Sequence, residues 1–335
     1  MEKSEVRSIY LLAGFLVFAY ALPFAVGVWT DSIFYDRQWL ADLATVALSG
    51  LMQGGVYAMF AVGLTLIFGV MRVINVAHGE LVVLGAYLTW VMFNMPEWLG
   101  IDVYVDPLLT MVVSLPLAFL LGYGIQKLLL NAVVGGPELT PLLITFGIGI
   151  SLVNIVEWIF TTDYHTIPYE PDALRLTASI AVGKNKVISF GMAFLISMSV
   201  YIFLKVARLG KAIRATAQNA DVAMVCGINI YSIYMITFGL GAALAAAGGT
   251  LVSIQFGFNP ETGLQYTVVA FAIIILGGRG NFIGALIGAL MLGVIENLIA
   301  FMVPNGSAMV EIAAYGLMIC TLLIRPRGLM GAKEG

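Results

Sequence analysis

Long apolar stretches alternate with short polar ones along the whole chain. A helix needs about 20 mainly apolar residues to cross a bilayer, and most of these stretches reach or approach that length. The pattern predicts an all-α polytopic membrane protein with about ten transmembrane helices, or about eight if one helical hairpin is absent. We expect the spans near residues 9–29, 43–69, 76–93, 108–130, 139–160, 187–206, 230–256, 264–278, 282–303 and 309–324.

The predicted spans form a single transmembrane domain over residues 1–335. Three segments stand out within it: residues 1–40 with the first span and an external loop, the external loop 161–186, and a cytoplasmic insert at 208–229. Ala19-Tyr20-Ala21 resembles a signal-peptide cleavage site, so the first span is either removed or retained. The apolar run continues past that point, which favours retention.

Positive charge predicts the orientation of the chain. If the spans alternate from a cytoplasmic amino terminus, twelve of the 16 Lys and Arg residues fall on the cytoplasmic side. Cytoplasmic loops of membrane proteins carry an excess of Lys and Arg. We therefore expect a multi-pass protein of the plasma or inner membrane with both termini in the cytoplasm.

Composition agrees with a chain embedded in lipid. Hydrophobic residues make up 61%, charged residues 10%, and the mean hydropathy is +0.99, whereas soluble domains carry about 25% charged residues. The formal net charge is −3 and no basic stripe follows the chain, so nucleic acid is not an expected partner. The cysteines Cys226 and Cys320 have no ligand spacing and the only histidines are His78 and His165, so we expect no metal site.

A polar break separates the second and third predicted spans. It contains Arg72, Asn75, His78 and Glu80, with apolar runs on both sides. At membrane depth each polar group needs a partner or a wet cavity. The break therefore either lines or gates a transport path, or it braces the two spans; the sequence favours neither.

Two acidic residues, Glu157 and Glu296, fall inside predicted spans. Intramembrane carboxylates are functional candidates, although each can instead lie at an interface or be protonated and hydrogen-bonded. No catalytic triad or paired acid and base is visible in the sequence.

Gly278, Gly280 and Gly284 imitate a dinucleotide-binding fingerprint, but the helix that follows is apolar on every face, which a soluble βαβ unit does not allow. A tight hairpin fits better, with Gly284 and Gly288 as a close helix-packing pair. No Gly-x-x-x-x-Gly-Lys-Ser/Thr stretch occurs. We therefore expect no ATP hydrolysis by this chain and predict that it is not an enzyme.

The cytoplasmic insert is alanine-rich and helix-prone, and Gly227 suits a helix end. It contains Arg214, Asn219, Asp221 and Ala223. The insert is either a helix that docks a partner or an ordinary positively charged loop, and charge counting predicts its cations in both cases.

The polar break belongs to a set of stretches that fit one family. They are Gly63-Leu-Thr-Leu-Ile-Phe-Gly69, Asn75-Val-Ala-His-Gly-Glu80, Leu84-Gly-Ala-Tyr87, Arg214-Ala215, Gly227-Ile228-Asn229, Leu276-Gly-Gly-Arg-Gly280, Gly284-Ala285 and Arg325-Pro-Arg-Gly328. Over about residues 43–330 the chain resembles the permease subunits of branched-chain amino acid ABC importers, of the LivH type.

The resemblance implies an ABC importer permease fold and several partners. These are a second homologous permease subunit, two cytoplasmic ATPase subunits that bind ATP and Mg²⁺, and an extracytoplasmic solute-binding protein. No cofactor is then bound by this chain itself. Asp221-Val-Ala223-x-x-x-Gly227 resembles a degenerate Glu-Ala-Ala-x-x-x-Gly coupling helix, which docks into the ATPase. The loop at 162–175 would face the binding protein.

The resemblance also orders the possible cargoes. Branched-chain or other hydrophobic amino acids come first, and urea or short amides come second, because related permeases carry them. An autonomous secondary carrier or channel would need ion-coupling carboxylates in the membrane, for which only Glu157 and Glu296 are available. A third possibility is a non-transporting membrane anchor, but the polar break gives this alternative no support.

Overall fold

The computed structural model describes residues 37–137, 139–169, 174–175, 181–303, 306–325 and 328–330. Its long helices are α2 (Arg37–Met71), α3 (His78–Trp98), α4 (Met111–Ile125), α5 (Leu139–Phe160), α6 (Lys184–Val206), α9 (Ile230–Ser253), α10 (Gly263–Gly277), α11 (Phe282–Met302) and α12 (Gly306–Ile324). Its shorter elements are the π-helix η1 (Gln126–Leu130), α7 (Arg208–Gln218), α8 (Ala220–Val225), the 3-10 helix η2 (Pro260–Thr262), and the strands β1 (Leu174–Arg175) and β2 (Ala181–Val182).

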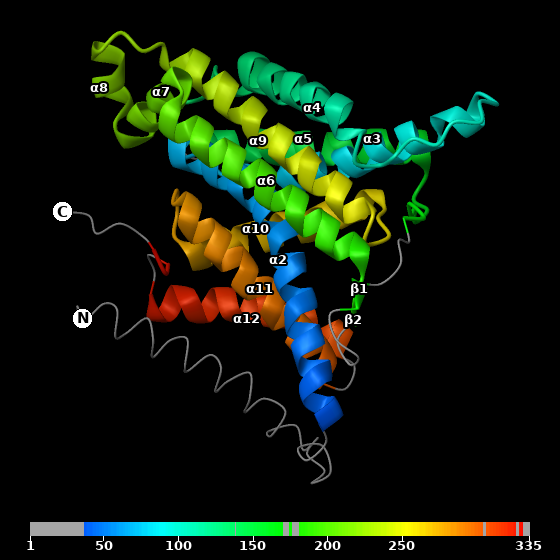
Figure 1. The fold of residues 1–335 in the computed structure, drawn as a ribbon. Coiled ribbons are helices and arrows are strands. Elements are labelled where there is room, and N and C mark those ends of the chain that lie inside the picture. Colours follow the sequence, from blue (N-terminus) through cyan, green and yellow to red (C-terminus); the bar gives the residue numbers. More distant parts are fainter. Residues whose placement is uncertain are drawn as a thin grey trace.

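Helix α2 connects the two parts of the bundle. Figure 1 shows α4, α6 and α9 on one side of it and α10, α11 and α12 on the other. α2 contacts α6 and α9 in the first group and α10 and α11 in the second. Because α2 touches both groups, it forms the centre of the core.

The prediction of a mostly helical membrane protein is confirmed. Within the described residues, seven segments are long and apolar enough to cross a membrane: α2, α4 with η1, α5, α6, α9, η2 with α10, and α11. Helix α3 is not among them, and α12 contributes only the shorter apolar helix Ala314–Ile324. The first predicted span, with its possible cleavage site, lies outside the described residues. The count of ten spans therefore stays a prediction.

Glycines bring α2 and α11 into close contact. A Cβ atom at Gly50 would lie 2.6 Å from the carbonyl oxygen of Gly293, and one at Gly54 would lie 2.6 Å from that of Ala289. Small residues four positions apart allow membrane helices to approach at the backbone. Gly54 therefore lies at a point of close packing between α2 and α11.

Helix α9 packs against α2, α3 and α4 through its small residues. A Cβ atom at Gly63 of α2 would lie 2.7 Å from the carbonyl oxygen of Gly241, and one at Gly249 would lie 2.8 Å from the amide nitrogen of Ala86. The glycine- and alanine-rich sequence of α9 therefore serves close packing on several sides.

The hairpin between α10 and α11 is built on glycines in left-handed backbone conformations. Gly278 has φ +106° and Gly280 has φ +74°. The carboxy-terminal segment joins this hairpin, since the amides of Leu329 and Met330 donate hydrogen bonds to the carbonyl oxygens of Leu276 and Gly277, at 2.7 and 3.0 Å.

Candidate translocation site

The polar break lies in the loop between α2 and α3. Helix α2 ends at Met71, and Arg72 has a positive φ of +55°, which turns the chain out of the helix. Helix α3 then begins at His78. Arg72 is exposed, Asn75 and His78 are fully buried, and Glu80 is half-buried. The four predicted residues therefore do not share one environment.

His78 fastens the first turn of α3 to the middle of α2. Its Nε2 lies 2.7 Å from the carbonyl oxygen of Phe60, so the Nε2–H group donates a hydrogen bond there. The approach depends on a glycine, because a Cβ atom at Gly63 would lie 3.3 Å from Cε1 of the imidazole. A buried polar ring with a backbone partner stabilises a fixed arrangement of helices.

Two threonines bridge the break from other helices. Thr145 of α5 accepts a hydrogen bond from the amide of Val76 at 3.2 Å and donates one to the carbonyl oxygen of Ile74 at 3.1 Å. Thr267 of α10 accepts one from the amide of Gly79 at 2.9 Å and donates one to the carbonyl oxygen of Val76 at 3.1 Å. These hydroxyls satisfy backbone groups that the interrupted helix leaves free.

Asn75 differs from its neighbours because its buried amide has no hydrogen-bond partner among the described residues.

The side chain of Glu80 extends toward α10 and α5. Its carboxyl group lies directly against Gly263 at the start of α10, and its Cγ lies 3.7 Å from the Cβ position of Gly149 on α5. Glu80 therefore lies where α3, α5 and α10 meet.

Glu296 belongs to a second polar cluster, between α2 and α11. Its Oε2 accepts a hydrogen bond from the Tyr57 hydroxyl at 2.8 Å, and the Gln53 Nε2 lies 3.5 Å away. Asn297 donates to the Oε1 of Gln53 at 2.8 Å. Glu296 was predicted from the sequence as a candidate, whereas its partners were not. The spacing of Gln53 and Tyr57, one helical turn apart, was the available signal.

Glu157 lies half-buried near the end of α5, apart from this cluster. The outer face of the same helix carries a row of small and polar residues: Gly147, Ser151 and Asn154, all exposed. Ser151 donates a hydrogen bond to the Gly147 carbonyl oxygen at 2.8 Å, and Asn154 donates to that of Ile150 at 2.7 Å. We call Gly147, Ser151 and Asn154 the α5 row. The α5 row was not predicted from the sequence, although its spacing of four and three residues is that of one helix face.

The predicted cytoplasmic insert, residues 208–229, contains α7 and α8, which project beyond the other helices at one end of the molecule (Figure 1). Asn219 caps α8, since its side chain accepts a hydrogen bond from the amide of Val222 at 3.1 Å. Gly227, with φ +83°, ends the helix. Asp221 is exposed, whereas Ala223 is buried.

The side chains that α8 exposes are largely apolar. Val225 is 87% exposed, and Val222 and Met224 are also exposed. Arg214, on the preceding α7, is exposed and its Nη2 lies 3.5 Å from the carbonyl oxygen of Lys205. Apolar side chains held in water at a protruding helix are typical of a surface that another protein covers.

The glycines of the α10–α11 hairpin have packing roles. Gly284 lies against the backbone of Gly277, and a Cβ atom at Gly288 would lie 3.0 Å from the carbonyl oxygen of Ile273. Asn281 caps α11 by accepting a hydrogen bond from the amide of Gly284 at 3.0 Å. Among the elements that the structure describes, no βαβ unit surrounds the hairpin, so the hairpin lacks the context of a nucleotide-binding site.

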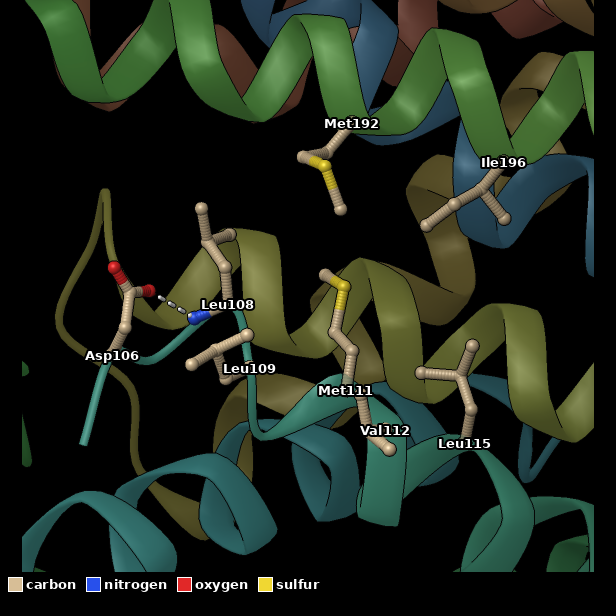
Figure 2. A pocket seen from close by; sticks show the side chains of 8 residues that line it. All are labelled: Asp106, Leu108, Leu109, Met111, Val112, Leu115, Met192 and Ile196. Atoms are coloured by element: carbon tan, nitrogen blue, oxygen red, sulfur yellow. Dashed lines mark hydrogen bonds between the residues drawn. The ribbon is translucent and has the colours of Figure 1, made fainter.

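A groove between α4 and α6 is a poor candidate for binding a polar cargo. Figure 2 shows it between α4 and α6, with Met192 and Ile196 facing Met111 and Leu115. Its single charged side chain, Asp106, accepts a hydrogen bond from the amide of Leu108 at 2.8 Å. The groove, of about 570 Å³, suits lipid chains better than a charged solute.

Among the described residues no group of three His, Cys, Asp or Glu side chains is placed to hold a metal ion.

Comparison with known proteins agrees with this architecture. The model of the family "Branched-chain amino acid transport system / permease component" matches residues 46–322. The permease protein BraD of Pseudomonas aeruginosa is 32% identical, over 86% of this chain and 95% of that protein. LivH of Escherichia coli K12 is 28% identical over 85% and 94%, and LivM of Salmonella typhimurium is 24% identical over 98% and 76%.

The described part of the chain holds seven apolar helices of membrane-crossing length with polar clusters buried among them, and these define an integral membrane protein of the permease class. The chain belongs to the branched-chain amino acid transport system permease family. Its relatives are named as transport permeases, which are non-catalytic subunits, in agreement with the prediction that the chain is not an enzyme.

Proposed function

We propose that this chain is the permease subunit of an ATP-driven importer for branched-chain or other hydrophobic amino acids. A second homologous permease chain, two cytoplasmic ATPase subunits and an extracytoplasmic solute-binding protein complete the importer. The names of the relatives BraD and LivH, which describe high-affinity branched-chain amino acid transport, support this cargo. The chain binds no cofactor, and ATP and Mg²⁺ belong to the ATPase subunits.

The observation that carries the proposal is the α5 row. Ser151 lies near the middle of a 22-residue apolar helix, with Asn154 almost one turn further on. Polar side chains at that depth are unfavourable against lipid and usually face another protein chain or water. In the described part of the chain, Oδ1 of Asn154 accepts no hydrogen bond. A hydrogen-bond donor of another protein chain can therefore bind to this oxygen.

We assign the α5 row to the second permease chain. The similarity to both LivH and LivM, two permease proteins named for the same transport system, supports a paired assembly. Glu80 lies beside Gly149 on the same helix, so the carboxyl group is close to the proposed contact. We place Glu80 and Arg72 near the cytoplasmic end of the path that the cargo follows.

Asn75 and His78 have a different proposed role. Both are fully buried, and His78 is bonded to α2. These positions favour bracing of the α2–α3 break over direct contact with a cargo. Of the two roles that the sequence left open for the polar break, we assign bracing to these residues and lining of the path to Glu80 and Arg72.

Helix α8 is the proposed contact with an ATPase subunit. Asn219 caps the start of this short helix, which stabilises it at the surface of the bundle. The exposed valines of α8 form an apolar surface. Closure of the ATPase pair on ATP would move this helix and the spans attached to it. This role requires that α7, α8 and both termini lie in the cytoplasm, as the positive charges of the sequence predict.

The test is a reconstitution of this chain with a second permease, two ATPase subunits and a binding protein in lipid vesicles. We expect leucine, isoleucine or valine to stimulate ATP hydrolysis and to be taken up. Stimulation by urea or a short amide would keep the importer and change its cargo. Transport of a labelled solute by this chain alone, without ATPase subunits, would replace the importer with an autonomous secondary carrier.

A further inference from the structure

A cavity of about 200 Å³ lies between α2, α10, α11 and α12. None of its lining residues belongs to the polar break or to the α5 row. Its polar lining consists of Tyr57, Gln265, Tyr266, Glu296 and Tyr315, and its apolar lining of Val268, Val269, Val310 and Ala314. Drug-sized ligands occupy roughly 300–1,000 Å³, so this cavity suits a smaller molecule that has one polar end and one aliphatic end.

Glu296 supplies the acidic group in the polar lining of the cavity. Its side chain is 3% exposed, and Oε2 accepts the hydrogen bond of the Tyr57 hydroxyl at 2.8 Å. In the described part of the chain Oε1 accepts no hydrogen bond. A carboxylate buried at membrane depth needs a proton or a cation beside it. The described lining contains no Lys, Arg or His that could serve.

We propose that this cavity binds the ammonium group of an aliphatic amino acid or amine, with Glu296 as the counter-ion. The side chain of the ligand lies against Val268, Val269 and Val310, and the tyrosine hydroxyls surround its polar end. This inference rests on the proposed function and specifies its cargo: the ligand carries an ammonium group, which urea and short amides lack.

The charge of the cavity can be measured with thiol reagents. The protein would carry Val269→Cys, with Cys226 and Cys320, both exposed, changed to Ser. We expect a cationic aminoethyl methanethiosulfonate to react at least about tenfold faster than its anionic sulfonatoethyl counterpart, since a buried charge concentrates counter-ions. Glu296→Gln should abolish this preference. The control is a cysteine at Leu115, in the groove between α4 and α6, where the ratio of the two rates should not change in Glu296→Gln.

A second measurement identifies the ligand. In the complete importer, leucine and isopentylamine should protect the cysteine at position 269, whereas 4-methyl-2-oxopentanoate and urea should not. Asn297→Ala is the control for the packing of α2 on α11. It removes the hydrogen bond from Asn297 to Gln53, and Asn297 is not one of the residues that line the cavity. Protection and charge preference should survive in Asn297→Ala and disappear in Glu296→Gln. Equal losses in both variants would mean that Glu296 only joins α2 to α11, and would overturn the proposal.

The two proposals fail in different ways. If the importer takes up leucine but leucine does not protect the cavity cysteine, the cavity proposal is wrong and the importer remains. If the importer moves no amino acid while isopentylamine still protects the cysteine, the cavity proposal stands and the proposed function is wrong.

Discussion

His78 at the start of α3 donates a hydrogen bond to the backbone carbonyl of Phe60, in the middle of α2, across 2.7 Å. This bond crosses the polar break and makes the beginning of one helix depend on the centre of another. The residues around it are packed so closely that small substitutions test the arrangement directly.

His78→Leu should lower stability without abolishing transport by the molecules that fold. The substitution fills the site with an apolar side chain of moderate size but removes the buried hydrogen bond to Phe60, which costs about 1–3 kcal/mol. The measurements are the thermal midpoint of the purified assembly and the uptake rate per folded importer. Normal stability with failed uptake would instead place His78 in the path of the cargo.

Gly79→Ala should be more damaging than the size of a methyl group suggests. A Cβ atom there would lie against the carbonyl oxygen of Gly263 and 2.5 Å from Oγ1 of Thr267. Overpacking of this kind costs about 1–3 kcal/mol or more. Gly191→Ala on α6, where the Cβ position has no neighbour within 4 Å, is the matched control and should be neutral or slightly stabilising. Equal thermal midpoints for the two variants would contradict the close packing of α3 on α10.

Ser151→Leu and Asn154→Leu should weaken the association of this chain with a second permease subunit. Both changes suit a surface that faces lipid, and both remove polar groups from a surface that faces protein. Ser199→Leu on α6 is the control, because Ser199 is also exposed and bonds only to the Leu195 carbonyl oxygen, at 2.7 Å.

The measurement for the α5 row is copurification of the two permease chains at increasing detergent concentration. Loss of the pair in the α5 variants but not in Ser199→Leu is the expected result. Unchanged pairing in all three variants would remove the α5 row from the interface.

Val225→Asp should reduce substrate-stimulated ATP hydrolysis by the complete importer while the chain still inserts and folds. The side chain is 87% exposed on α8, so a charge there disturbs little within this chain but opposes an apolar contact. Val225→Ile preserves the apolar surface and should keep the activity. Full stimulation in Val225→Asp would exclude this part of α8 as the ATPase contact. Ala223 is a poorer test position, because it is buried and a larger residue would disturb α8 itself.

The sequence predicted the helices well where a polar or glycine-rich segment ends an apolar run. Residues 139–160 became α5 with the predicted bounds, after the Gly-Gly-Pro turn. Helix α3 instead continues five residues beyond the predicted end at Phe93. Asn94 looks like the start of a loop, but its side chain bonds back to the Trp90 carbonyl oxygen at 2.8 Å and the helix continues.

The candidate sites were less predictable because their partners are distant in the chain. Glu296 was identified as an intramembrane carboxylate, yet its hydrogen-bond donor Tyr57 lies 239 positions away. Thr145 and Thr267 likewise reach the polar break from α5 and α10. Helical periodicity reports which face a residue occupies, but it does not report which distant helix covers that face.

The length of α2 has a mechanical consequence. Its 35 residues correspond to about 52 Å at 1.5 Å per residue, well beyond the roughly 30 Å of a hydrocarbon core. Such a helix tilts or extends past the lipid. A rigid rod of this length, pivoting by about five degrees around its midpoint, moves its two ends by about 2 Å in opposite directions. The end near Arg37 and the end at the polar break would then respond together, as the two arms of one lever.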